Sequence, residues 1–231
     1  MKLNMKHEVS IGIDVSSTST AVTIITNWGD IKHHVFTNKL TKYHKESKCI
    51  TSHLVSNKED MDTLPTRDQV NKLIDDNSTD YYCKYDRYDR IAKDVAREVN
   101  KYFDCKYHIY FEGYSYSSQA GCLIDLVTLT TLIKREINNN RMQFNNLYSI
   151  IAPQSLKKYA CGNAHKKDKH DMMNNLIDKY PELELVKELK TLPLQKSVQK
   201  PYDDVVDSMW LALCDISNEE EKFETLQLFL N

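Results

Sequence analysis

Apolar residues alternate with polar ones near the start of the chain and predict β-strands. Residues 8–26, EVSIGIDVSSTSTAVTIIT, contain two apolar runs separated by a Ser/Thr-rich turn, which is the pattern of a β-hairpin. Residues 31–37 can add a third strand to the same meander. Two further apolar runs, at 108–114 and 147–153, each predict one strand, and a proline stops the second.

Helical spacing of apolar residues dominates the rest of the chain. It predicts helices over about 85–103, 118–138, 155–160, 168–180, 202–217 and 219–230. Asp168 is the expected N-cap of the fourth helix. The polar stretches 39–83 and 181–200 have no sustained periodicity, so we expect a surface insertion with a short helix near 67–75 and a polar connection, respectively.

This order of elements predicts the fold class. Three strands followed by alternating helices and strands indicate a mixed α/β sheet with helices on its faces. The length of 231 residues suits one large domain, and only five Gly and five Pro argue against long flexible linkers. We therefore expect a single domain over 1–231, with a polar insertion at about 39–83 and a C-terminal helix at about 219–230.

Composition narrows the possible settings and partners. Hydrophobic residues make up 41% and charged residues 28%, as in ordinary globular proteins. The formal net charge of −2 excludes the strongly basic class of nucleic-acid-binding proteins, so any DNA binding must rely on local positive charge. No apolar run approaches the roughly 20 residues of a membrane helix, and the six cysteines lack zinc-ligand spacing. We expect a soluble intracellular protein that is not secreted.

Four acidic residues stand where a strand end or a helix face can present them. Asp14 and Glu112 each follow the apolar run of a predicted strand, and Asp204 and Asp207 share one face of a predicted helix. Buried carboxylates are costly without a cation, and gathered carboxylates suit hard divalent ions. Each acid alone has a commoner explanation, as a turn-forming residue, a solvated strand end or a first-turn helix acid. Taken together, the four favour a metal site.

The segments that carry these acids resemble a known family. IGIDVSSTSTAVTII, IYFEGYSYSSQAG, APQSLKKYACGNAHKKDKHDMM and DDVVDSMWLAL are similar, in this order, to the motifs of the RuvC family of Holliday-junction resolvases, including its viral and phage members. The resemblance covers roughly 8–26 and 107–215. It implies a ribonuclease-H-like fold and a homodimer that acts inside a host cell by making paired nicks in four-way DNA junctions.

The resemblance also implies roles for individual residues. It maps the catalytic and metal-binding acids onto Asp14, Glu112, Asp204 and Asp207, with two Mg²⁺ (or Mn²⁺) ions per active site. The family's spacing of three favours Asp204 over its neighbour Asp203 as the ligand.

The same resemblance points to residues that contact DNA. Lys166 and Lys167, in a locally basic stretch, are candidate DNA-binding residues, although a solvated basic loop is the alternative. Tyr114 and Tyr116 can stack on bases or pack as ordinary amphipathic residues. The helix at 118–138 corresponds to the family's dimer helix, but its apolar stripe could instead belong to the core.

Departures from the family pattern keep other functions open. Val15-Ser16-Ser17 stands where the family often has a glycine, and the early polar insertion is longer than in compact bacterial members. The first motif also resembles the phosphate-binding hairpin of the sugar-kinase, heat-shock ATPase and actin superfamily, whose second lobe and glycine-rich loop this chain lacks. A noncatalytic DNA-binding protein, and a nuclease of flaps, forks or RNA–DNA hybrids, are further alternatives.

Overall fold

A six-stranded sheet lies at the centre of the computed structural model, which describes residues 5–55, 76–114, 120–139, 147–192 and 199–215. The strand order is β4-β3-β2-β1-β5-β6. The strands are β1 (Val9–Asp14), β2 (Ser19–Thr26), β3 (Ile31–Thr37), β4 (Ile50–Leu54), β5 (Tyr107–Glu112) and β6 (Leu147–Ile151). The first three strands pair antiparallel, whereas β5, β6 and β4 join in parallel. This confirms the expected mixed sheet, with an antiparallel meander followed by parallel strands.

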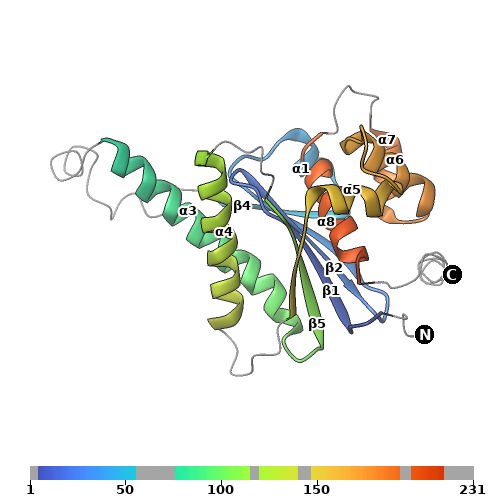
Figure 1. Cartoon of the computed structure of the whole chain (residues 1–231), viewed down its shortest axis with the longest axis horizontal. Coiled ribbons are helices and arrows are strands. Elements are labelled where there is room, and N and C mark those ends of the chain that lie inside the picture. The colour runs from blue at the N-terminus through green and yellow to red at the C-terminus, as the bar shows by residue number, and fades with distance from the viewer. Residues whose placement is uncertain (1–4, 56–75, 115–119, 140–146, 193–198, 216–231) are drawn as a thin grey trace.

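Helices cover both faces of this sheet (Figure 1). They are α1 (Lys42–Glu46), α3 (Asp76–Val99), α4 (Ala120–Asn139), α5 (Pro153–Cys161), α6 (Lys169–Lys179), α7 (Glu184–Thr191) and α8 (Tyr202–Leu213), with a 3-10 turn η1 (Asn100–Tyr102) after α3. The helices α3 and α4 pack on one face, and α5 to α8 gather on the other. Within the described residues, none of the helices is both long and apolar enough to cross a membrane.

The polar stretches contain elements that the sequence did not predict. The stretch 39–83 contributes α1, the edge strand β4 and the start of α3. The sequence did not indicate β4, because Ile50 is the one buried residue of this strand and its hydrophobic pattern is weak. The stretch 181–200 contains α7, which buries one apolar face through Leu185, Val186 and Leu189. The helices expected near 67–75 and 219–230 lie outside the described residues.

Alternation along β1 directs its residues to opposite layers. Val9, Ile11 and Ile13 join the core formed with α3 and α4. The intervening residues face α8: the Ser10 hydroxyl donates to the Ala212 carbonyl at 2.6 Å. Small side chains on this face therefore let α8 lie directly on the strand.

Gly12 marks the closest approach of β1 and α8. A Cβ at this position would lie 2.0 Å from the Ser208 carbonyl oxygen and 2.5 Å from the Ala212 amide nitrogen. On the neighbouring strand, the Thr23 hydroxyl lies 2.7 Å from the Ser208 hydroxyl. Only glycine permits this spacing, because both of the nearest atoms belong to the helix backbone.

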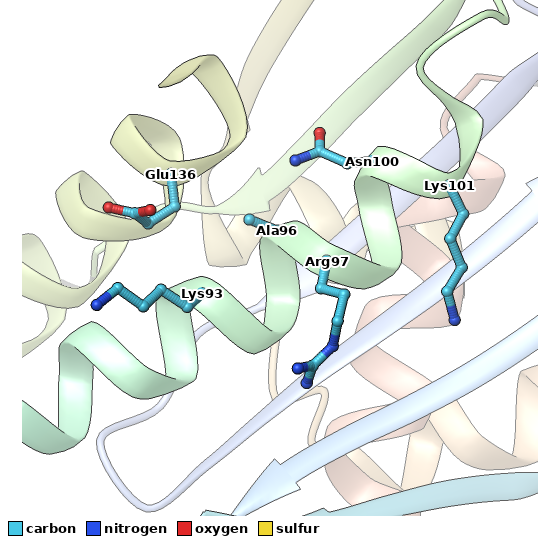
Figure 2. A pocket seen from close by; sticks show the side chains of 6 residues that line it. All are labelled: Lys93, Ala96, Arg97, Asn100, Lys101 and Glu136. Atoms are coloured by element: carbon cyan, nitrogen blue, oxygen red, sulfur yellow. The ribbon is translucent and has the colours of Figure 1, made fainter. Parts of the chain in front are cut away.

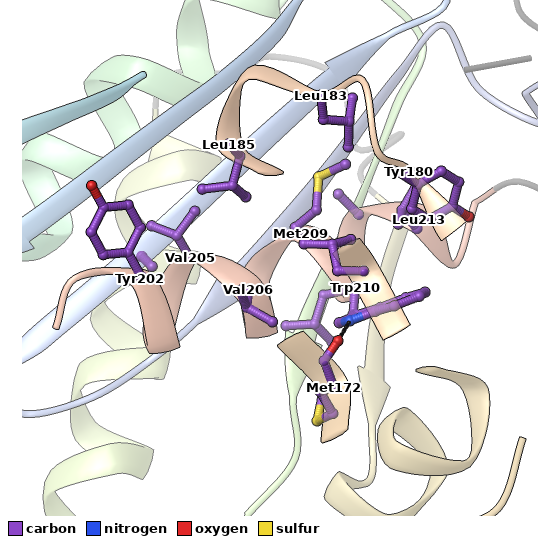
Figure 3. Close-up of a cluster of buried hydrophobic side chains, with 14 of the residues drawn as sticks. Met172, Tyr180, Leu183, Leu185, Tyr202, Val205, Val206, Met209, Trp210 and Leu213 are labelled. Atoms are coloured by element: carbon purple, nitrogen blue, oxygen red, sulfur yellow. Dashed lines mark hydrogen bonds between the residues drawn. The ribbon is translucent and has the colours of Figure 1, made fainter. Parts of the chain in front are cut away.

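The outer side of α8 is buried as well (Figure 3). Val205, Met209 and Trp210 belong to the apolar cluster that α8 shares with α5, α6, α7 and the sheet. The Trp210 indole Nε1 donates to the Met172 carbonyl at 3.1 Å, and this bond is the dashed line in Figure 3. Beyond the helix, the buried Asp215 accepts from the Tyr110 hydroxyl at 2.8 Å. Because α8 is packed on both sides, these contacts fix how far it lies along β1.

We expect Gly12→Ala to destabilise the protein by about 3 kcal/mol or more, because the added methyl group would overlap the α8 backbone. Urea unfolding followed by circular dichroism measures this loss. Gly121→Ala is the matched control, since a Cβ there meets no atom within 4 Å and alanine favours the helix. A Gly12→Ala protein as stable as the control would show that the helix is not held this closely.

Candidate metal centre

Two neighbouring strand ends supply the first two acids of the centre. The parallel pairing of β1 with β5 runs to Ile13 opposite Phe111, and the next residues of the two strands are Asp14 and Glu112. Ile13 and Phe111 both point into the α3/α4 core. Alternation therefore turns the two carboxylates toward the opposite face, where α8 lies.

The third acid comes from α8. Because α8 packs on β1 with Ser208 beside Gly12, the preceding Asp207 reaches the end of the strand. One carboxylate oxygen from each of Asp14, Glu112 and Asp207 lies within 4.8 Å of the others. The structure thus brings together three of the four acids expected from sequence.

The fourth expected acid, Asp204, is held differently. Its two carboxylate oxygens accept from the Lys200 ammonium at 2.9 and 2.8 Å, and it is not part of the three-acid group. Its neighbour Asp203 has a buried Oδ1 atom with no hydrogen-bond partner. The geometry therefore gives neither residue a place among the three converging acids.

Lys169 is a residue of this site that the sequence did not single out. It is the first residue of α6, which Asp168 caps by accepting from the Asp171 amide at 3.0 Å, as expected. The Lys169 ammonium lies 2.8 Å from Asp207 Oδ2 and 3.7 Å from Asp203 Oδ2. The predicted N-cap Asp168 indicated where α6 begins. The sequence near it did not indicate that Lys169 would contact acids of α8, because those acids are distant along the chain.

The electrostatics show an excess of negative charge at the site. Burial, and then the charges of Asp207 and Glu112, raise the pKa of Asp14 well above its usual value. Burial likewise raises the pKa of Glu112 and that of Asp207, where Lys169 opposes the shift. The positive charge of Lys169 therefore does not neutralise the three carboxylates of Asp14, Glu112 and Asp207. Oxygen donors with uncompensated charge fit a hard divalent cation.

A cavity of about 320 Å³ opens beside these acids. Glu112 and Asp207 line it together with Lys157, Lys169 and Tyr114. A phosphate group approaching the acids would therefore meet two lysines and one aromatic ring.

The remaining candidate DNA-binding residues lie elsewhere. Lys166 and Lys167 precede α6 and do not line the cavity; Lys166 is exposed and Lys167 pairs with Asp171 at 3.1 Å. Tyr116 lies outside the described residues.

The sequence matches no protein-family model and no curated protein. Solved structures with a similar fold include T. thermophilus RuvC in complex with a Holliday junction substrate, at 13% identity and a TM-score of 0.48 over 90% of this chain and 92% of that chain. A second T. thermophilus RuvC structure has 14% identity and a TM-score of 0.45 over 89% and 91%. The yeast mitochondrial Holliday junction resolvase Ydc2 has 14% identity and a TM-score of 0.47 over 95% and 79%. At such distances, function has to be argued from the site itself.

We expect Asp14→Asn to stabilise the metal-free protein. Because burial and neighbouring acids raise the pKa of Asp14, ionisation of this carboxyl is less favourable in the folded chain than in the unfolded one. In EDTA at neutral pH, urea unfolding should show a gain on the order of 1 kcal/mol.

The pH dependence of this gain follows from the raised pKa. The wild-type carboxyl contributes stability at low pH that is lost as pH rises through its folded-state pKa. The advantage of Asp14→Asn should therefore be absent below about pH 4 and should grow as pH rises toward and through the folded-state pKa of Asp14. Asp178→Asn, at an exposed position of α6, should show no such gain. A less stable Asp14→Asn protein at neutral pH would contradict the proposed charge excess.

Proposed function

We propose that this protein is a metal-dependent nuclease that hydrolyses phosphodiester bonds in branched DNA, with four-way junctions as its principal substrate. The observation that carries the proposal is the convergence of Asp14, Glu112 and Asp207 beside a cavity lined by two lysines. Carboxylates that hold hard cations next to a phosphate-binding surface suit phosphodiester hydrolysis.

Asp14, Glu112 and Asp207 would hold Mg²⁺ or Mn²⁺, and two ions per site are expected. Asp204 is a further donor if its pair with Lys200 opens. Bound divalent ions supply a more acidic water and neutralise charge on the phosphate that is cleaved. The raised pKa values of the three acids are consistent with this role, because a cation would favour their ionised forms.

The other residues of the cavity bind and orient the substrate. The Lys169 ammonium, half exposed and paired with Asp207, is placed to exchange this carboxylate for a phosphate oxygen. Lys157 offers a second positive charge on the same wall, and Tyr114 offers a ring for a sugar or base. Lys166 and Lys167 extend the positive surface beyond the cavity, where a longer DNA arm would pass.

A homodimer would supply the two cuts that resolution of a junction requires. Two opposed strands must be nicked, and the described part of each chain contains one set of converging acids. The inner face of α4 buries Leu129, Ile133 and Ile137, so this part of its apolar stripe belongs to the core. Ile124 and Val127 on the same helix remain exposed and offer an apolar surface to a second copy.

We expect the purified protein to nick a synthetic four-way junction in Mg²⁺ and to lose this activity in EDTA. Asp14→Asn and Asp207→Asn should each lower cleavage by about 100-fold or more while leaving junction binding largely intact, because they remove cation ligands and not phosphate contacts. Gel assays of cleavage and binding measure these effects.

Asp178→Asn serves as the control and should cleave like wild type. A panel of linear duplex, flap, fork, RNA–DNA hybrid and four-way junction establishes the substrate. Full cleavage in EDTA, or an active Asp14→Asn enzyme, would disprove the metal-centre proposal. Preference for a flap or hybrid would keep the chemistry and replace the substrate.

The salt dependence of junction binding should report the contacts of Lys166 and Lys167. If each lysine meets one phosphate, Lys166→Ala or Lys167→Ala should reduce the slope of log K against log salt by about one, since fewer counterions are released. Lys187→Ala, in α7, is the matched control and should leave the slope unchanged. Equal slopes for all the proteins would place the DNA elsewhere.

A further inference from the structure

A second group of ligating side chains lies on the opposite layer of the sheet. It consists of His34 on β3, His53 on β4 and Glu98 on α3, with one donor atom from each within 4.8 Å of the others. The Nδ1 atom of His34 lies 3.2 Å from Nε2 of His53, and its Nε2 atom lies 3.7 Å from Glu98 Oε2. Among the described residues, this is the only such group that contains histidine.

Strand register explains why these residues meet. In the parallel β3–β4 pair, Phe36 is opposite His53, and Phe36 belongs to the core beneath α3. His34 lies two residues before Phe36 and therefore shares its face. The His53 ring stacks on Phe36 at 4.6 Å between centroids, with 11° between the planes. Both imidazoles are thus directed toward α3, where Glu98 stands.

Burial and charge give these groups the protonation states of metal ligands. His34 and Glu98 are only 8% and 6% exposed, whereas His53 is partly exposed and leaves a path from solvent. Burial lowers the pKa of His34 to about 4 and also lowers that of His53, so both rings are neutral at pH 7. Although burial opposes it, the Lys101 ammonium holds the pKa of Glu98 below its usual value.

We propose that His34, His53 and Glu98 form a second metal site, selective for a borderline transition-metal ion such as Zn²⁺ and distinct from the carboxylate centre. Imidazole nitrogens suit such ions, whereas all-oxygen donors suit Mg²⁺ or Mn²⁺. Ligand atoms of a tetrahedral zinc site lie roughly 3.3 Å apart. One donor atom from each of the three residues lies within 4.8 Å of the others, so a bound ion would draw the side chains slightly together. Three protein ligands leave the fourth position to water.

Lys101, in η1, is the competitor for this site. Its ammonium forms an ion pair with Glu98, but its side chain is 59% exposed and can turn into solvent. Figure 2 shows Arg97 extending from the last turn of α3 and Lys101 extending from η1, beside a hollow that Lys93 also lines. All three cations have acidic partners on α3, so the hollow itself has little positive charge to offer an anion.

A metal bound here would connect three elements. It would fasten the edge strand β4, which already pairs with β3, to α3 as well. The consequence is a local increase in stability at one corner of the sheet, without any direct contact with the carboxylate centre.

The test is a Zn²⁺ titration of the untagged full chain in excess Mg²⁺, with a chromophoric chelator as competitor. Wild type should bind one Zn²⁺ per chain and unfold at a higher temperature when loaded. His53→Ala and Glu98→Gln should each weaken binding by at least about tenfold. Co²⁺ should give a tetrahedral visible absorption band in wild type that is lost in both variants.

Lys101→Met separates a metal site from a structural network. Removing the competing cation should tighten Zn²⁺ binding by about two- to fivefold, and Zn²⁺ should restore the melting temperature that the metal-free variant loses. His165→Ala, at an exposed histidine, and Asp14→Asn, in the carboxylate centre, should both bind Zn²⁺ like wild type. Equal Zn²⁺ affinity of wild type and His53→Ala, or weaker binding by Lys101→Met, would overturn the proposal.

Discussion

The contact between β1 and α8 at Gly12 is the constraint on which the carboxylate centre depends. A helix can approach a strand this closely only where the strand has no side chain, and Gly12 supplies that gap. The Ser10 hydroxyl on β1 donates to the Ala212 carbonyl, and the Ser208 hydroxyl is hydrogen-bonded to that of Thr23 on β2, so both strands fix the helix. With the helix in this place, Asp207 reaches the strand end that carries Asp14. Asp14 and Asp207 therefore meet because Gly12, two residues before Asp14, has no side chain to keep α8 away from β1.

The same packing creates an electrostatic problem. Burial raises the pKa of Asp14, Glu112 and Asp207, which means that their ionised forms are costly in the folded chain. Lysines offset part of the charge, Lys169 at Asp207 and Lys200 at Asp204. Burying acids without sufficient compensation lowers stability, and such tension is common where a site must bind a cation. The carboxylate centre is in this sense prepared for a positively charged ligand.

Local pattern predicted those elements whose hydrophobic residues are regularly spaced. The strand β1 alternates clearly, β2 contains a compact apolar run, and α8 has apolar residues on most of its surface, so the sequence predicted all three. It missed β4, an edge strand with one fully buried residue, because there is almost no alternation to detect. It missed α7 because polar residues outnumber its buried Leu and Val. Elements that contribute little to the core leave a weak signal, whatever their role in the fold.

The sequence by itself determined that acids would stand at the ends of β1 and β5 and on one face of the last core helix, because strand and helix periods are local properties. Only the tertiary structure decided which acids converge, since Asp14 and Asp207 come from opposite ends of the described chain and meet through packing. It also brought Lys169 to Asp207 and joined His34, His53 and Glu98 across three elements. Contacts between distant residues depend on how closely layers pack and in which register, and no local period encodes that distance.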